Sequence, residues 1–216
     1  MKKFSNPRVE TFILGSLDTN CYLAICSDTL ETIIIDPADE GGFISEKILE
    51  LKLKPLCVVF THGHFDHVLG SLELRLNFDL PIYLHKKDHT LVKKAQDSAK
   101  YWLKKQDVPP VPSDLSFIKE GETLEFGNCQ LKIIETPGHT PGSISLVSES
   151  LSQDNKNKKT IIFTGDTLFK NAVGRTDVKY SKPMDMEKSL QNLFEYPQDT
   201  VCYPGHGATT TIAHES

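Results

Sequence analysis

The amino-acid sequence predicts an α/β fold in which two packed sheets carry helices on their outer faces. Both halves of the chain begin with short runs rich in β-branched and aromatic residues, and both place a run of helical periodicity later. In the first half, the order helix, strand, loop and helix follows the pattern of a βαβ unit, whose strand-end loops usually carry ligands. A length of 216 residues suits one domain over residues 1–216 with a sizeable core.

The first half is expected to contain five strands, at residues 9–14, 21–25, 32–35, 56–60 and 82–84. Short turn-type segments separate the first three, which indicates antiparallel neighbours. A helix is expected from Gly41 until Pro55 breaks the pattern. A second helix is expected from about Val68, with apolar residues at Leu69, Leu72, Leu76 and Phe78.

Residues 86–112 are expected to form a helical segment followed by a connector, near the active site. Lysines recur throughout residues 86–107, and aspartates offset part of their charge. A solvated helical face explains this pattern, and so does a lid that offers cations to an anionic substrate. Three prolines between residues 108 and 112 cannot continue a helix, so this stretch predicts an extended connector.

The second half is expected to contain strands at residues 123–126, 130–134, 143–147, 160–164 and 200–203. The polar stretch 148–159 is typical of an exposed hairpin loop. A short helix is expected at residues 184–194, between the fourth and fifth of these strands.

The composition narrows the classes of protein that the chain can represent. A hydrophobic content of 38% with 25% charged residues is ordinary for a globular protein, and a net charge of −5 argues against nucleic acid or anionic membrane as partners. No apolar run is long enough to span a bilayer. The lysines near the N-terminus are not followed by an apolar run, so we expect no signal peptide and a cytoplasmic location.

The cysteines support the same location, because their number is odd and no CxxC spacing occurs. Several lie in apolar strand-like runs, where cysteine behaves as a small hydrophobic residue. We therefore expect reduced, buried thiols at Cys21, Cys26, Cys57, Cys129 and Cys202.

The strongest functional signal is the stretch 61–67, Thr-His-Gly-His-Phe-Asp-His, directly after the expected strand 56–60. It places three imidazoles and a carboxylate, which are natural ligands of Zn²⁺ and similar divalent metals, within six residues. Three further loops, at 136–142, 163–167 and 203–207, repeat one design of strand, Gly or Pro turn and possible ligand. Together these loops offer seven donors, which suit two metal ions better than one: His62, His64, Asp66, His67, His139, Asp166 and His206.

The sequence resembles the metallo-β-lactamase superfamily and, within it, the short single-domain glyoxalase II (hydroxyacylglutathione hydrolase) type. Besides the four ligand loops, the shared stretches are 18–22, 36–37, 174–177, 205–207 and 210–212. The resemblance implies a four-layer αβ/βα sandwich of two mixed sheets with outer helices. It also implies that His62, His64 and His139 bind one metal, that Asp66, His67 and His206 bind the second, and that Asp166 bridges them.

The same resemblance implies a binuclear metallohydrolase that cleaves small acyl-thioesters such as S-lactoylglutathione. A hydroxide bridging the metals would attack the carbonyl carbon, because a bound metal lowers the pKa of water from 15.7 to about 7. Asp66 would be the catalytic residue that holds this hydroxide. Two divalent ions are expected, Zn²⁺ first, with Fe or Mn²⁺ as alternatives, and the partner would be a small-molecule thioester.

Two other reactions remain open for this ligand set. An iron-dependent persulfide dioxygenase of the same superfamily shares the ligand pattern and a similar Gly-Arg-Thr-Asp stretch, here residues 174–177. Those dioxygenases tend to carry Cys directly before the stretch, whereas this chain has Val173, which favours hydrolysis. Lactone or β-lactam opening is chemically adjacent. Longer glyoxalase II proteins bind glutathione with a C-terminal helical region that the short type lacks, so the thiol is left open.

Two residues are candidates for substrate binding. Arg175 could form a structural ion pair, or its planar guanidinium could position a substrate carboxylate. Tyr83, at the end of an expected strand, could line the site or pack in the core. His85 and His89 are four residues apart, a spacing that can bind metal, but surface histidines are the preferred interpretation.

Overall fold

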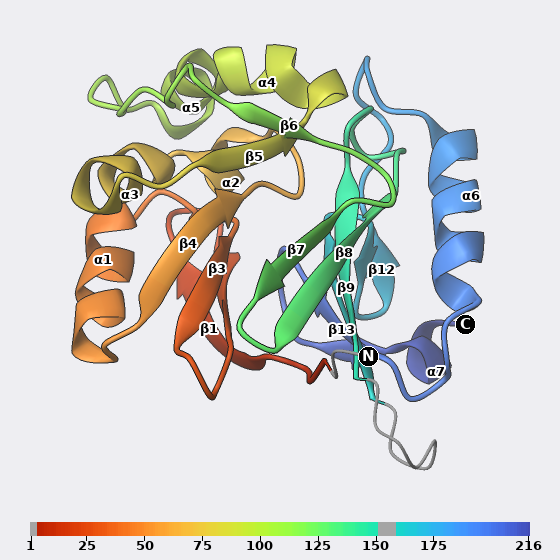
Figure 1. The fold of residues 1–216 in the computed structure, drawn as a ribbon. Helices are drawn as coiled ribbons and strands as arrows, with labels where there is room; N and C mark the ends of the chain where they lie inside the picture. Colours follow the sequence, from red (N-terminus) through yellow and green to blue (C-terminus); the bar gives the residue numbers. More distant parts are fainter. Residues whose placement is uncertain (1–3, 151–158) are drawn as a thin grey trace.

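Two six-stranded sheets pack face to face at the centre of the protein, with helices on their outer sides (Figure 1), in a computed structural model that describes residues 4–150 and 159–216. This arrangement confirms the predicted sandwich of two mixed sheets with outer helices. Residues 1–3, which begin the N-terminal stretch expected not to be a signal peptide, lie outside the described residues, as do residues 151–158 in the middle of the expected hairpin loop.

The first sheet has the order β1-β2-β3-β4-β5-β6. Its strands are β1 (Arg8–Leu14), β2 (Thr19–Ile25), β3 (Glu31–Ile35), β4 (Lys54–Val59), β5 (Ile82–His85) and β6 (Ser116–Ile118). The first three are antiparallel, as predicted, and β3 to β6 are parallel because helical connections separate them. The strand β6, which has only three residues, was not predicted from the sequence.

The strand β3 shows why the centre of this sheet is apolar throughout. Ile33 and Ile35 point into the layer between the sheets, and Ile34 points to the opposite face, where α1 (Gly41–Glu50) packs. A strand buried on both faces needs apolar residues at every position rather than an alternating pattern.

The helix predicted from about Val68 is in fact two helices, α2 (Phe65–Val68) and α3 (Ser71–Phe78). Between them Gly70 donates its N–H to the carbonyl of Ala38, and a Cβ at Gly70 would lie 2.5 Å from the carbonyl oxygen of Pro37. The predicted apolar side is also wrong in part. Leu74 is completely buried, whereas Leu76 is 75% exposed.

Residues 86–112 form three short helical pieces followed by irregular backbone. The pieces are the 3₁₀ turn η1 (Lys86–Asp88), α4 (His89–Lys93) and α5 (Ala95–Leu103). Lys104 adopts a left-handed conformation that ends α5, so the predicted helix stops before residue 107. The connector then returns over α2, where Val108 and Val111 pack with Leu69.

The second sheet has the order β14-β13-β10-β9-β8-β7 and contains one parallel pair, β10 with β13. Its strands are β7 (Thr123–Phe126), β8 (Cys129–Glu135), β9 (Ile144–Glu149), β10 (Thr160–Gly165), β13 (Val201–Pro204) and β14 (Thr210–Thr211). A separate ribbon joins β11 (Leu168–Phe169) to β12 (Ala172–Val173). The helices α6 (Pro183–Phe194) and α7 (Ile212–Glu215) cover the outer face through Leu193 and Ile212.

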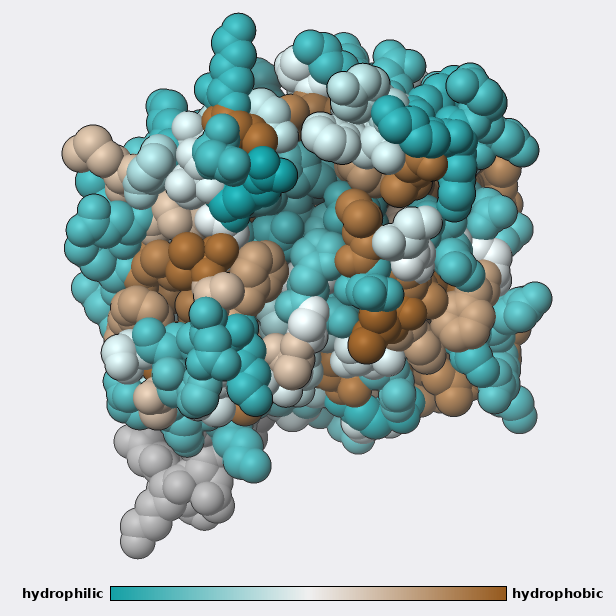
Figure 2. All heavy atoms as spheres, turned by 180° about the vertical axis from the view of Figure 1, so that it is seen from behind, coloured by the Kyte–Doolittle hydropathy of each residue, from teal (hydrophilic) through white to brown (hydrophobic). Residues whose placement is uncertain are grey.

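The layer between the sheets is an apolar core. Tyr22, Phe163 and Tyr203 form its aromatic centre, with ring centroids 5.2 to 5.5 Å apart. The five cysteines are all buried and free, as expected for reduced thiols. The outside is mainly hydrophilic with scattered hydrophobic patches on the face seen in Figure 2. Every helix within the described residues is too short or too polar to span a bilayer.

The two leucines of α3 provide a matched test of this packing. Leu74→Ala should lower the free energy of unfolding by about 2–5 kcal/mol, because it leaves a cavity under a fully buried side chain. Leu76→Ala makes the same chemical change on the same helix and should shift stability by no more than about 0.5 kcal/mol. Urea unfolding measures both, and equal effects would contradict the orientation of α3.

Candidate metal centre

Four loops meet at one edge of the two sheets. The stretch 61–67 follows β4, the His139 loop joins β8 to β9, Asp166 follows β10, and His206 follows β13. Because β10 and β13 are parallel neighbours, Asp166 and His206 emerge at the same edge, and Gly205 donates its N–H to the carbonyl of Gly165 at 2.8 Å. All seven donor residues singled out in the sequence are brought together there.

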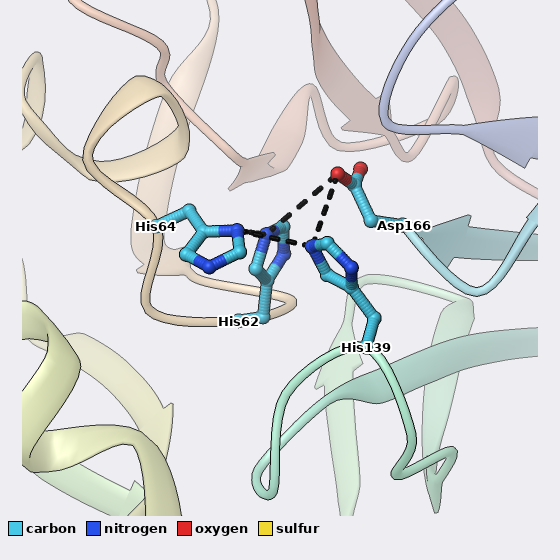
Figure 3. Close-up of side chains that lie close together, drawn as sticks. All are labelled: His62, His64, His139 and Asp166. Carbon is cyan, nitrogen blue, oxygen red and sulfur yellow. Dashed lines mark hydrogen bonds and ion pairs between the residues drawn. The ribbon is translucent and has the colours of Figure 1, made fainter. Parts of the chain in front are cut away.

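One group consists of His62, His64, His139 and Asp166, whose side chains converge in Figure 3. His64 Nδ1 lies 3.0 Å from Nε2 of His62 and 3.0 Å from Nε2 of His139. Asp166 Oδ2 lies 3.5 Å from His139 Nε2 and 3.9 Å from His62 Nε2. A tetrahedral ion with bonds of about 2.0–2.1 Å holds its ligand atoms about 3.3 Å apart, so these spacings fit one divalent metal.

The second group consists of Asp66, His67 and His206. Nε2 of His67 lies 3.2 Å from Nε2 of His206, and Asp66 Oδ2 lies 3.4 Å and 3.3 Å from these two nitrogens. The spacings again fit a small ion, and Asp166 supplies a fourth donor because its Oδ1 lies 3.5 Å from His67 Nε2.

Asp166 thus has one carboxylate oxygen near each group, and its environment favours a cation. Its Oδ1 is buried and accepts no hydrogen bond from any described residue. A buried carboxylate oxygen without a donor is costly unless a positive charge compensates it. The residues present thus fit two divalent ions, with Asp166 within reach of both positions.

The electrostatics of the two groups differ. Burial and, after it, the charge of the neighbouring His139 together lower the pKa of His64 to about 3, so His64 is neutral and free to bind a metal. Burial also lowers the pKa of His67, but the negative charges of Asp66, Asp166 and Asp36 outweigh it and raise the pKa to about 10. The second group therefore has a negative potential in which a metal cation can replace the proton of His67.

Asp36 holds the second group in place from behind. Its carboxylate accepts hydrogen bonds from the backbone N–H of Thr61 at 2.8 Å, the hydroxyl of Thr61 at 2.7 Å and Nδ1 of His67 at 3.0 Å. Metal-binding histidines usually donate their outer N–H to such a carboxylate, which fixes the tautomer. Asp36 belongs to a stretch shared with the family, but its role was not predicted from the sequence.

Asp88 joins the two halves of the centre. Its buried carboxylate accepts hydrogen bonds from the N–H of Gly63 at 2.8 Å, the N–H of Gly142 at 2.7 Å and the hydroxyl of Thr140 at 2.6 Å. It therefore ties the loop of His62 and His64 to the loop of His139. Sequence reasoning treated this residue only as a charge offsetting the lysines around it.

Tyr180 is the contact that sequence reasoning missed entirely. Its hydroxyl lies 2.6 Å from Nε2 of His64, whose Nδ1 faces the first group. With Nδ1 bound to a metal, Nε2 would carry the ring proton and donate it to this hydroxyl. Backbone carbonyls serve the same purpose elsewhere, since His139 donates from Nδ1 to Arg175 and His206 to Leu17. Tyr180 lies in irregular backbone, 116 residues from His64, and no local pattern marks it.

The other candidate residues lie outside the two groups. The guanidinium of Arg175 is exposed and forms a bidentate pair with Asp177, at 2.7 and 3.0 Å. Tyr83 packs against the core between the sheets. The surface interpretation is wrong for His85, which is buried with Nε2 3.1 Å from Glu135, while His89 packs edge-on against Phe117.

Known proteins are similar to this chain in sequence and in fold. A family model described as the metallo-beta-lactamase superfamily matches residues 14–206. The hydroxyacylglutathione hydrolase GloC of Haemophilus influenzae is 31% identical over 212 residues, covering 96% of this chain and 94% of that protein. Two crystal structures superimpose along nearly their whole length. BLEG-1 B3 metallo-beta-lactamase has a TM-score of 0.81 at 29% identity, covering 96% of this chain and 95% of that one. TTHA1623 in a di-iron-bound form has a TM-score of 0.79 at 33% identity, covering 95% and 96%.

Removing the tyrosine hydroxyl tests its support of the first group. Tyr180→Phe should weaken the affinity for a metal ion by about 10- to 100-fold, because His64 loses the partner that orients its ring. Competition with a chromophoric chelator measures this affinity. Tyr101→Phe, a change of an exposed tyrosine, is the control. An unchanged affinity in Tyr180→Phe would show that the contact does not position His64.

Asp36→Asn tests the second group separately. The Asp36 carboxylate accepts the backbone N–H of Thr61 on one oxygen and both the Thr61 hydroxyl and His67 on the other, whereas an amide has one acceptor oxygen. Part of this support is therefore lost, and the second group should lose about 10- to 100-fold in metal affinity. Elemental analysis after dialysis against a graded chelator should then find close to one ion where the parent protein keeps two. Asp79→Asn, at the exposed end of α3, is the control. Retention of two ions at equal affinity would contradict the role of Asp36.

Proposed function

The chain belongs to the metallo-β-lactamase superfamily, and from this membership we propose that it is a binuclear metal-dependent hydrolase of small acyl-thioesters, of the glyoxalase II type. The observation that carries the proposal is the pair of donor groups that share Asp166. The similarity to GloC, whose name states a hydroxyacylglutathione hydrolase, supports the substrate class.

In this proposal His62, His64 and His139 would hold one ion, Asp66, His67 and His206 would hold the other, and Asp166 would be available to both. Imidazole and carboxylate donors suit Zn²⁺, Fe and Mn²⁺ alike, and we propose Zn²⁺ as the first choice. When bound, such ions supply an acidic water with a pKa of about 7 and a Lewis acid for the carbonyl oxygen.

Asp66 is the proposed catalytic carboxylate. Burial would raise its pKa, but the positive charge of His67 and the hydrogen bond from His206 outweigh that effect and hold the pKa well below its usual range. Asp66 is therefore ionised at neutral pH and can accept a hydrogen bond from the attacking water. The hydroxyl of Thr19, 3.3 Å from Oδ2, helps to orient the carboxylate.

Thioester hydrolysis makes modest demands on the remaining residues. Attack of water on the carbonyl carbon breaks the C–S bond and releases a carboxylic acid and a thiol. Because a thiol has a pKa near 8.5, the thiolate leaves without a strong general acid. The protein's contribution is then to hold the donors, orient the water and bind the two ends of the substrate.

A persulfide dioxygenase is the second candidate, and one observation favours it. TTHA1623, which is 33% identical to this chain, has been crystallised in a di-iron-bound form. A protein of this fold and of similar sequence can therefore hold iron, the metal that such a dioxygenase needs. Val173, in place of the cysteine typical of the dioxygenases, supports hydrolysis instead.

Substitution of the donors tests the proposed hydrolase. Asp66→Asn and His64→Ala should each lower the rate of S-lactoylglutathione cleavage by more than about 100-fold and reduce the metal content, because each removes a donor rather than an outer partner. Thiol release measures the rate and elemental analysis the metal. His214→Ala, an exposed histidine outside both groups, is the control.

The same preparations separate the candidate reactions. Oxygen consumption with glutathione persulfide and cleavage of a β-lactam are measured on zinc-loaded and iron-loaded protein. Full thioester cleavage in Asp66→Asn or His64→Ala would overturn the proposed hydrolase. Oxygen uptake without thioester cleavage in the parent protein would overturn it as well.

A further inference from the structure

A pocket of about 400 Å³ lies directly beside the metal centre. Its lining includes His64 and Tyr180, which contact each other, and Lys87, Leu91 and Lys94 from the segment between η1 and α5. The Tyr180–His64 contact thus connects the pocket to the donors. A substrate whose reacting carbonyl reached the donors could extend into this space.

The charge of the pocket is positive in a protein whose net charge is −5. Lys87 and Lys94 are among its lining residues, and no aspartate or glutamate is. Lys87 is partly neutralised from outside by Glu135, at 3.0 Å. Lys94 forms no ion pair with the described residues, so its charge is available to a ligand.

An adjoining pocket of about 190 Å³ extends the same surface. It shares Lys87, Pro141 and Tyr180 with the first and adds Lys182, which lies 3.9 Å from Asp185. The lining of the two pockets together contains three lysines, Lys87, Lys94 and Lys182, and one carboxylate, that of Asp185. The excess of positive charge is therefore local and continuous from His64 outward.

The size of the pocket indicates which end of the substrate enters it. Pockets for small molecules are typically about 300–1,000 Å³, far larger than a lactoyl group. The thiol part of an acyl-thioester is the larger end and is the one that can fill 400 Å³. Its apolar atoms would contact Leu91 and Pro141.

We propose that this pocket binds the thiol part of the substrate through an anionic group, a carboxylate or a phosphate, and that Lys94 is the main contact for that group. The inference rests on the proposed hydrolase and deepens it, because it assigns a substrate class to the same site. It also gives a role to the lysine-rich segment 86–103.

The experiment uses two pairs of substrates that differ in charge on the thiol part. One pair is S-lactoylglutathione and its dimethyl ester, and the other is S-lactoyl-4′-phosphopantetheine and S-lactoylpantetheine. The metal-loaded parent protein should cleave the anionic member of at least one pair with the higher kcat/KM. The pair that discriminates identifies carboxylate or phosphate as the recognised group.

Lys94→Met keeps the apolar stem and removes the charge. It should lower the kcat/KM ratio of anionic to neutral substrate by about 5- to 20-fold, mainly through KM, since a charge-assisted contact is lost. Lys93→Met is the matched control, because Lys93 is the adjacent exposed lysine and lines a different pocket. In this control the ratio should stay at the parent value.

The outcomes separate the two proposals. If no thioester is cleaved, the proposed hydrolase fails. If thioesters are cleaved but the charged and neutral members react alike, or Lys94→Met and Lys93→Met change the ratio equally, the anionic subsite is wrong while the hydrolase stands.

Discussion

Asp66 and His67 lie on the short helix α2, whereas the other five donors lie in loops, whose backbone can be buried because carboxylates satisfy its N–H groups. Asp36 accepts from Thr61, and Asp88 accepts from Gly63 and Gly142. An unpaired buried N–H costs about 1–3 kcal/mol, so each contact decides whether a loop can stay in place. Asp88 matters most, because its three bonds join the first half of the chain to the second. The separation of His64 from His139 depends on it.

Close approach of backbone segments is the second condition for the site. Gly165 precedes Asp166 with a φ of +50°, and a Cβ there would lie 2.5 Å from the hydroxyl of Thr61. Glycine is the residue that accepts both the backbone conformation and the contact. The end of β10 therefore reaches the loop after β4, and Asp166 arrives between the two histidine groups. The glycine that marks a turn in the sequence is thus also the residue that lets these two loops approach each other.

The donor set bears on the class of reaction, whereas the pocket beside it bears on the choice of substrate. Seven imidazole and carboxylate groups support metal-dependent hydrolysis, and relatives named as a hydroxyacylglutathione hydrolase and a β-lactamase share the fold. The centre therefore limits the reaction class without choosing the substrate. Substrate choice depends on the surroundings, where the helical segment after β5 places Lys87 and Lys94 beside His64. In this fold, loops and short helices carry that specificity while the sheets stay constant.

The sequence by itself determined most strands, the free cysteines and the residue types of the seven donors, because side-chain periodicity and Gly or Pro turns are local properties of the chain. Their assignment as ligands stays a prediction that the geometry supports. Only the tertiary structure decided that Leu74 rather than Leu76 is buried, that Asp88 ties two loops, and that Tyr180 meets His64 from 116 residues away. These contacts depend on how distant elements pack and in which register, which no short stretch of sequence encodes.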